Sequence, residues 1–172
     1  MSDDLQVAVV VGNPKPRSRT YQAAVLVAEK LSGAPPAVVV DVVDLGAGLL
    51  DWGDPVTSQA VEAVRAAHLV VVASPTYKAA YTGLLKVFLD RFPSEGLRGV
   101  VAVPLMLGAG PGHALAPEHT LRPVLVELGA STPTRGLYLL DSNFTDPEVL
   151  DRWLGQAVGQ VRGALRREPG TG

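Results

Sequence analysis

Hydroxyl and basic side chains alternate with prolines in one short segment near the start of the 172-residue chain. The segment reads Gly12-Asn13-Pro14-Lys15-Pro16-Arg17-Ser18-Arg19-Thr20. Ser18 or Thr20 can cap a helix that begins here, and the unpaired N–H groups and positive dipole of a helix start bind anions. Lys15 and the two arginines add positive charge, so the segment predicts a phosphate site. The alternative is an ordinary N-cap flanked by solvated basic residues.

Two later segments suit a flat ligand. The first reads Ser74-Pro75-Thr76-Tyr77-Lys78-Ala79-Ala80-Tyr81-Thr82-Gly83, and the second reads Gly108-Ala109-Gly110-Pro111-Gly112. Pro75 fixes the backbone so that neighbouring amides can point into a crevice, and Tyr77 can offer a ring edge to a planar group. The glycines of the second segment allow the backbone to approach such a group closely. A plain packing role for Tyr77 is the alternative.

Composition excludes several chemistries. The chain has no cysteine, which excludes disulfides, iron–sulfur clusters and cysteine nucleophiles. Fifteen Lys and Arg against seventeen Asp and Glu give a net charge of −2, which offers no general attraction for nucleic acid or an anionic membrane. After the first apolar run there is neither a Gly-x-Gly-x-x-Gly fingerprint nor a Walker motif.

No catalytic side chain and no metal site are predicted. Four carboxylates fall close together, at Asp41, Asp44, Asp51 and Asp54, but they lack ligand spacing and are expected to be solvated loop residues. His68 precedes an apolar run, away from the segments above, and is expected to be structural. Ser74 lacks the surroundings of a nucleophile elbow.

Short β-branched runs alternate with amphipathic stretches along the chain, as in a parallel sheet joined by crossover helices. Strands are predicted at residues 6–11, 37–43, 69–73, 99–107 and 135–140, and helices at 18–31, 58–67, 82–91, 112–128 and 147–166. This pattern predicts one doubly wound α/β domain over residues 1–166, followed by a flexible tail at 167–172. The three segments follow the first, third and fourth strands, so they meet at the ligand-binding edge of the sheet.

Pro123 lies inside the predicted helix 112–128. A proline there removes a backbone hydrogen bond, so a kink or bulge is predicted near His119.

Three stretches of the chain carry a family resemblance: Gly12 to Thr20, Ser74 to Lys86, and Pro104 to Gly110 running on to His113 and Leu121-Arg122-Pro123-Val124-Leu125. They resemble the flavodoxin-like NAD(P)H-dependent FMN reductases, particularly those that supply reduced flavin to alkanesulfonate monooxygenases. The resemblance implies a three-layer α/β/α fold with a five-stranded parallel sheet in the order 2-1-3-4-5. It also implies hydride transfer from NADPH or NADH to FMN without a catalytic side chain. The implied cofactor-binding residues are Gly12, Asn13, Lys15, Ser18 and Thr20 around the phosphate, and Pro75, Thr76, Tyr77, Lys78, Gly108, Ala109 and Gly110 around the ring.

Alternative activities stay open at this point. One is a reductase that retains its flavin and reduces a quinone, an azo compound or a metal oxyanion. Another is a flavodoxin-type electron carrier without NAD(P)H activity, although the modest net charge and Lys15-Pro16-Arg17 count against it. The choice between NADPH and NADH is also open.

Partners and location follow partly from the resemblance. A homodimer or homotetramer is expected through Ala79-Ala80-Tyr81 and the Leu84-Leu85/Phe88-Leu89 face, with core burial as the alternative. A flavin-dependent monooxygenase is a further expected partner. In the resembling reductases an aromatic insertion falls where His119 lies, so His119 is a candidate for tuning flavin release or, alternatively, a surface histidine without chemistry. The acidic start and the lack of a long apolar run predict a cytoplasmic protein.

Overall fold

Five parallel strands form the single sheet of the computed structural model, which describes residues 5–166. They are β1 (Val7–Val11), β2 (Val38–Asp41), β3 (Leu69–Pro75), β4 (Val101–Gly108) and β5 (Leu137–Leu140). The strand order β2-β1-β3-β4-β5 confirms the predicted flavodoxin-like order. The order reverses between β1 and β3, and in such sheets a ligand crevice lies beyond the carboxyl ends of the strands at that point. The tail predicted at 167–172 lies outside the described residues.

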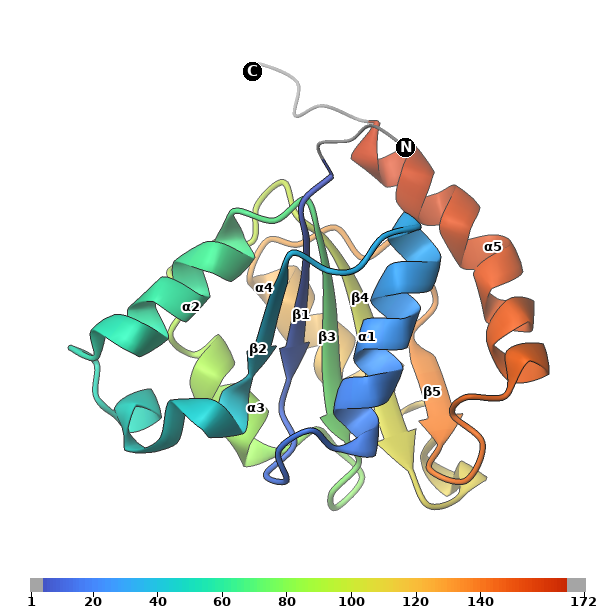
Figure 1. Cartoon of the computed structure of the whole chain (residues 1–172), viewed down its shortest axis with the longest axis horizontal. Helices are drawn as coiled ribbons and strands as arrows, with labels where there is room; N and C mark the ends of the chain where they lie inside the picture. The colour runs from blue at the N-terminus through green and yellow to red at the C-terminus, as the bar shows by residue number, and fades with distance from the viewer. Residues whose placement is uncertain (1–4, 167–172) are drawn as a thin grey trace.

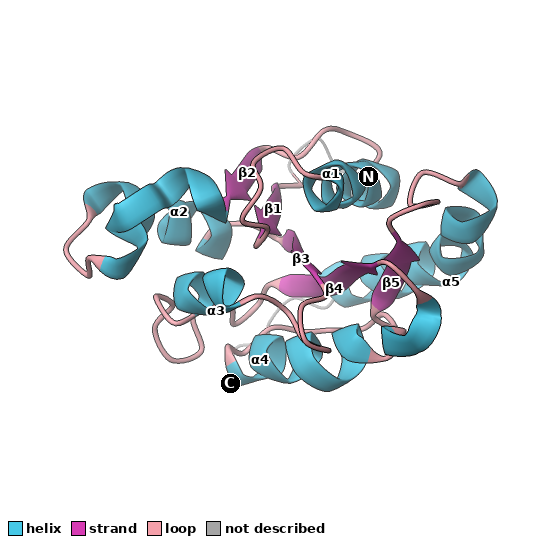
Figure 2. Ribbon diagram, turned by 90° about the horizontal axis from the view of Figure 1, so that it is seen from below, coloured by secondary structure: helices cyan, strands magenta, loops and turns pink. Residues whose placement is uncertain are grey.

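Helices cover both faces of the sheet, as Figures 1 and 2 show. One face carries α1 (Arg19–Ser32) and α5 (Pro147–Leu165), and the other carries α2 (Pro55–Arg65), α3 (Gly83–Leu89) and α4 (Arg122–Glu127). All residues of β1, β3 and β4 are buried, because strands covered on both faces need apolar side chains in both directions. The three-layer prediction is therefore confirmed.

Three elements differ most from their predicted form. The second strand ends at Asp41, and Val42–Leu50 forms an irregular 3₁₀ segment instead of continuing the strand. Helix α2 begins at Pro55, earlier than predicted, because Asp54 caps it and proline at the first helical position loses no hydrogen bond. The predicted helix 112–128 is divided into a 3₁₀ turn at Pro111–His113, a π-helix at Pro117–Leu121 and α4.

The apolar face of α3 belongs to the core. Leu85, Phe88 and Leu89 are 0–2 % exposed and pack under the sheet, so the predicted subunit contact is wrong for these residues. Leu84 and Val87 on the same helix are only partly buried. No helix within residues 5–166 has the length and hydropathy to span a membrane.

Candidate active site

The loop between β1 and α1 is organised by its own polar side chains. Ser18 caps α1 and accepts a hydrogen bond from the Tyr21 N–H at 3.2 Å. Asn13 connects the loop to the helix: its Nδ2 donates to Thr20 Oγ1 at 3.0 Å, and its Oδ1 accepts the Lys15 N–H at 2.9 Å. Within the described chain, the N–H groups of residues 18–20 and the hydroxyl protons of Ser18 and Thr20 have no partner. These unpaired donors lie within three consecutive residues at the start of α1, where an anion can bind.

Arg17 anchors this loop to the neighbouring strand. It has a left-handed backbone with φ of 51°, and its N–H and guanidinium donate to Asp41 Oδ2 at 2.9 and 2.8 Å. The guanidinium also pairs with Asp44 at 2.7 Å and lies over the Tyr21 ring. Hydrogen bonds to Asp44 and Asp41 raise the pKa of Arg17 above its ordinary value. The positive charge left for a bound anion is thus that of Lys15 and Arg19, both exposed.

Each of the four clustered carboxylates makes a hydrogen bond or an ion pair. The expectation of solvated loop residues is wrong for buried Asp41, whereas Asp44 and Asp51 are exposed as expected. The Asp41 side chain is only 2 % exposed and holds Arg17 together with Asp44. Asp51 accepts the Gly53 N–H at 2.9 Å, and Asp54 caps α2 by accepting the Thr57 N–H at 2.7 Å. Within residues 5–166, no three His, Cys, Asp or Glu side chains group as metal ligands.

The loop after β3 forms a tight two-residue turn. Tyr77 and Ala80 exchange backbone hydrogen bonds of 2.9 and 3.1 Å, while Lys78 and Ala79 between them take left-handed φ angles of 51° and 66°. The Thr76 N–H donates to the Leu107 carbonyl at 2.7 Å. The Thr76 and Tyr77 N–H groups therefore donate to carbonyl oxygens of the protein, contrary to the expectation that they point towards a ligand. In the described chain the N–H groups of Lys78 and Ala79 at the turn's tip make no hydrogen bond.

A hydrogen bond from Thr82 joins the third loop to the first loop. Thr82 caps α3, accepts the Leu85 N–H at 3.1 Å and donates its hydroxyl to the Gly12 carbonyl at 2.5 Å. A Cβ at position 12 would lie 2.3 Å from Leu85 Cβ. Gly12 is therefore required by the close approach of α3. Gly12 could therefore contact a cofactor, as predicted, only through its backbone atoms.

Gly108 at the end of β4 also has an internal reason to be glycine. A Cβ there would lie 2.0 Å from the Tyr138 hydroxyl, so the tyrosine occupies the space that a side chain would need. This corrects the reading of Gly108 as an opening for a flat ligand. Around Gly110 nothing lies within 4 Å of a built Cβ, and Ala109 is exposed, so these two residues do border open space.

An open pocket of about 390 Å³ separates the third-loop turn from the fourth loop. Ala79 lines it from one side, and residues 111–116, His119 and Thr120 line it from the other. His119 lies exposed on the π-helix, which confirms the predicted irregularity near this residue. None of the predicted cofactor-binding residues lines this pocket. Sequence reasoning named Ala79, Pro111, Gly112, His113 and His119 but did not assign them to one pocket. The remaining lining residues belong to no motif.

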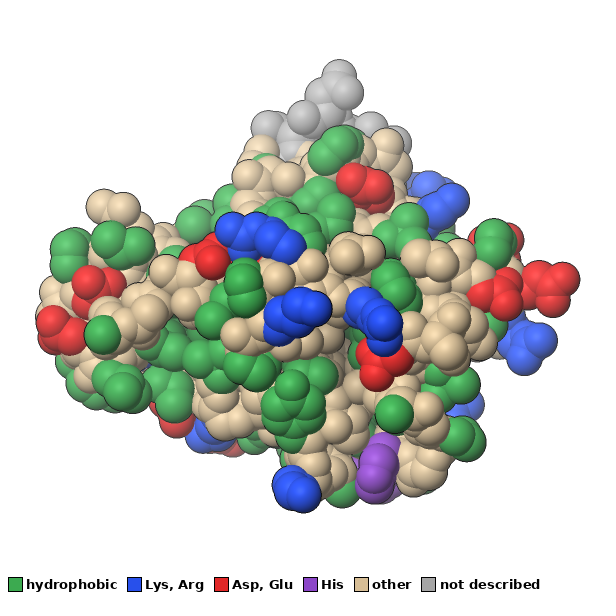
Figure 3. Space-filling view, turned by 60° about the horizontal axis from the view of Figure 1, so that its bottom comes forward, with side chains coloured by type: hydrophobic (Ala, Val, Ile, Leu, Met, Phe, Trp, Pro, Cys, Tyr) green, Lys and Arg blue, Asp and Glu red, His purple; other side chains and the backbone are tan. Residues whose placement is uncertain are grey.

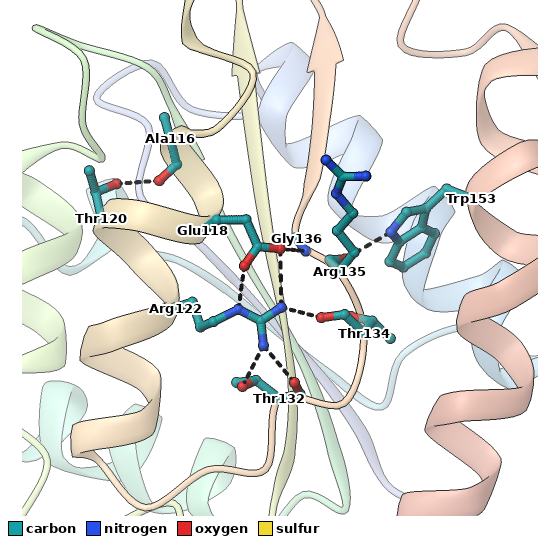
Figure 4. A network of polar contacts seen from close by, with 9 residues as sticks. All are labelled: Ala116, Glu118, Thr120, Arg122, Thr132, Thr134, Arg135, Gly136 and Trp153. Carbon is teal, nitrogen blue, oxygen red and sulfur yellow. Dashed lines mark hydrogen bonds and ion pairs between the residues drawn. The ribbon is translucent and has the colours of Figure 1, made fainter.

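A polar network fastens the π-helix to the connection between β4 and β5 (Figure 4). Arg122 makes a bidentate pair with Glu118, at 2.6 and 3.1 Å, and also donates to the Thr132 carbonyl and hydroxyl at 2.7 and 2.9 Å. Glu118 further accepts the Gly136 N–H. Burial alone would raise the pKa of Glu118, but these hydrogen bonds and the charges of Arg122 and Arg135 outweigh it and lower the pKa. The wall of the pocket is therefore firmly held.

The three loops and the pocket share the edge of the molecule at which the strands end. In Figure 3 this edge comes forward, and it shows basic, apolar and histidine side chains near one another. Such an edge can hold an anion at the start of α1 and a flat group beside the third loop. A second ligand can occupy the pocket.

Comparison with known proteins agrees with this geometry. A family model described as NADPH-dependent FMN reductase matches residues 5–145. The FMN reductase (NADPH) of Escherichia coli strain K12 is 33% identical over 146 residues, 83% of this chain and 76% of that protein. The NADH-dependent FMN reductase SfnF of Pseudomonas putida is 33% identical over 142 residues, covering 78% and 76%.

A solved structure leads to the same family. The apo form of an NADH:FMN oxidoreductase (EMOB) superposes with a TM-score of 0.86 at 32% identity, covering 97% of this chain and 93% of that one. Its match runs through all three loops of the candidate site, because it spans nearly the whole chain. The chain belongs to the NADPH-dependent FMN reductase family.

Proposed function

We propose that FMN binds at the edge defined by the three loops, with its phosphate at the start of α1. The observation that carries this proposal is the set of unpaired donors in residues 18–20 beside the buried Ser18 and Thr20. Exposed Lys15 and Arg19 supply positive charge around them. Charge-assisted hydrogen bonds of this kind are worth about 1.5 to 3 kcal/mol each before desolvation.

The ring lies beside Thr76 and Tyr77. Thr76 Oγ1 is buried and has no well-formed hydrogen bond within the described chain, so this face of the site has an unused polar atom for a ligand. Tyr77 is 52 % exposed and can cover one side of a flat group. Pro75 ends β3, and Lys78, Ala109 and Gly110 complete the border of the ring site.

The bound flavin supplies the hydride-accepting chemistry of the reaction. The protein holds the phosphate, orients the ring and receives the nicotinamide nucleotide in the pocket beside Ala79 and His119. No side-chain acid or base is needed. Relatives are named for NADPH and for NADH, and a comparison of kcat/KM for the two nucleotides decides between them here.

Reduced FMN then leaves for a flavin-dependent monooxygenase or another acceptor. Support comes from the open setting of the site, where Lys15, Tyr77 and His119 are all exposed. His119 on the π-helix is placed to influence the release of flavin. A homodimer or homotetramer through the Ala79-Ala80-Tyr81 turn and the partly buried residues of α3 stays part of the proposal.

The test is to mix pure protein with FMN and NADPH and to follow absorbance at 340 and 450 nm with and without oxygen. A ternary-complex steady-state pattern with FMN as a substrate supports the proposal, whereas a ping-pong pattern with retained flavin contradicts it. Tyr77→Ala is expected to weaken FMN binding by more than it lowers stability. An unchanged FMN dissociation constant in the folded variant would move the ring away from Tyr77.

A further inference from the structure

Tyr138 joins the loops on either side of the proposed ring site. It lies on β5 opposite Met106 of β4, and its hydroxyl donates to the Gly110 carbonyl at 2.7 Å. The same hydroxyl fills the space above Gly108, since a Cβ there would be 2.0 Å away. Tyr138 therefore contacts the fourth loop at two points, one at each end of the Gly108-Ala109-Gly110 turn.

The side-chain hydroxyl of Thr76, in the third loop, lies near the Tyr138 hydroxyl. Burial raises the pKa of Tyr138, and the nearby Thr76 hydroxyl partly opposes that effect by stabilising a phenolate oxygen. Thr76 Oγ1 nevertheless makes no hydrogen bond within the described chain and is buried without one. The Thr76 N–H donates to the Leu107 carbonyl at 2.7 Å, so the start of the third loop is paired directly with the end of β4.

We infer that Tyr138 is a positioning residue of the flavin site, which fixes the Gly108-Ala109-Gly110 backbone at the border of the proposed ring site. This inference rests on the proposed location of FMN. Ala109 and Gly110 have open space around them and no other side-chain anchor in the described chain. Without the Tyr138 hydroxyl, the Gly110 carbonyl loses its partner and the turn can move before the ring arrives. FMN binding must then order this turn, and the cost in conformational entropy weakens binding.

The first experiment compares FMN dissociation constants by fluorescence quenching for the wild type, Tyr138→Phe, Tyr21→Phe and Ser18→Ala. One lost hydrogen bond predicts a roughly three- to tenfold weaker binding in Tyr138→Phe. Saturating FMN should restore a kcat within about twofold of the wild type, since the variant changes binding and leaves the reacting groups in place. Tyr21→Phe is the matched control, because the Tyr21 hydroxyl makes no hydrogen bond within residues 5–166.

A second pair of variants tests the contact from the backbone side. Gly108→Ala forces a Cβ against the Tyr138 ring and should weaken FMN binding at least as much as Tyr138→Phe. In the double variant the nearest obstacle is Cζ at 2.9 Å instead of the hydroxyl at 2.0 Å. The added effect of Gly108→Ala should therefore be smaller than in the wild-type background. This comparison remains informative even if Gly108→Ala alone folds poorly.

The outcomes separate two failures. If Tyr138→Phe binds FMN like the wild type while Ser18→Ala binds it more weakly, the inference about Tyr138 is wrong and the proposed flavin site stands. If neither variant changes FMN binding, both are wrong. A lower melting temperature of the flavin-free Tyr138→Phe protein with an unchanged dissociation constant would likewise overturn the inference, because it would show a purely structural role.

Discussion

At the scale of single residues, contacts within the protein decide what several side chains of the three loops do. Ser18 caps α1 as expected, but Thr20 is instead held by Asn13. Gly12 and Gly108 are required by internal packing, because Leu85 and Tyr138 fill the space in which a Cβ atom would lie. Such close contacts join residues far apart in the chain, and no local pattern reveals them.

Ser18 should govern the preference for FMN over riboflavin. The two ligands share the ring and differ in the phosphate, so FMN should bind at least about tenfold more tightly at low salt. Ser18→Ala should reduce this ratio. The variant also loses a helix cap, at about 1 kcal/mol, so Asp146→Ala at the start of α5 is the matched control for cap loss. Equal FMN-to-riboflavin ratios in Ser18→Ala and the wild type, by fluorescence quenching, would remove Ser18 from the phosphate site.

Ala79 should be a point of backbone strain. Its φ of 66° lies in the left-handed region, which costs a residue with a Cβ about 1 to 2 kcal/mol. Ala79→Gly removes that cost but loosens the unfolded chain, so a net gain of about 0.5 to 1 kcal/mol in unfolding free energy is expected. Urea denaturation measures it. Ala80→Gly, one residue on and without a left-handed φ, should destabilise the protein, and a gain in that variant would argue against strain as the cause.

At the scale of elements, periodicity located every strand and most helices, and it failed where tertiary contacts decide the backbone. The amphipathic pattern predicted one helix over 112–128, whereas Pro111 and Pro117 each begin a new segment and Pro123 is the second residue of α4. Proline is accepted at the start of a helix and resisted in its interior. The pocket forms along this divided stretch, so its lining could not be predicted from an expected continuous helix.

The Glu118–Arg122 pair should stabilise the π-helix in a pH-dependent way. Because the pKa of Glu118 is lowered from its ordinary value of 4.5, its contribution is present above that pH and is lost as the pH falls through the folded-state pKa. Glu118→Gln should cost about 1 to 2 kcal/mol of unfolding free energy at pH 7. The difference from the wild type should shrink at acid pH. Urea denaturation at several pH values measures both effects.

The exposed Glu62–Arg65 pair on α2 is the control for this experiment. The Glu62 side chain is 66 % exposed, and solvent-exposed ion pairs contribute little to stability. Glu62→Gln should therefore stay within about 0.5 kcal/mol of the wild type. A Glu118→Gln deficit that is the same at pH 3 as at pH 7 would mean that packing, and not the carboxylate charge, supports the π-helix.

At the scale of the whole molecule, the alternation of strands and helices predicted a doubly wound sheet, and the family resemblance supplied the strand order 2-1-3-4-5 that the structure shows. Alternation of strands and helices, together with right-handed crossovers, limits the possible arrangements strongly. The distribution of charge was less predictable. Arg17 was counted with the phosphate loop, yet Asp41 and Asp44 pair with it, and both come from a segment more than twenty positions along the chain.

Ionic strength should therefore act on FMN binding through a small local cluster. With a net charge of −2 the whole chain does not attract anions, so any salt dependence must come from Lys15, Arg19 and the start of α1. FMN at a hundred times its dissociation constant should stabilise the fold by about 2.7 kcal/mol. For a chain of this size that corresponds to a rise of roughly 5 to 10 °C in Tm. Riboflavin at the same concentration should give a smaller rise.

The measurement is the Tm with and without ligand in 20 mM and 500 mM NaCl, taken as a difference at each salt concentration so that effects on the free protein cancel. Raising the salt should reduce the FMN-induced rise and leave the riboflavin-induced rise nearly unchanged, because only FMN carries a charge for the loop to bind. Lys15→Gln should remove part of the FMN salt dependence. Arg17→Gln should lower the Tm of the free protein, since it breaks the anchor to Asp41, and should change the salt dependence less. Equal salt dependence for FMN and riboflavin would mean that the phosphate lies away from the start of α1.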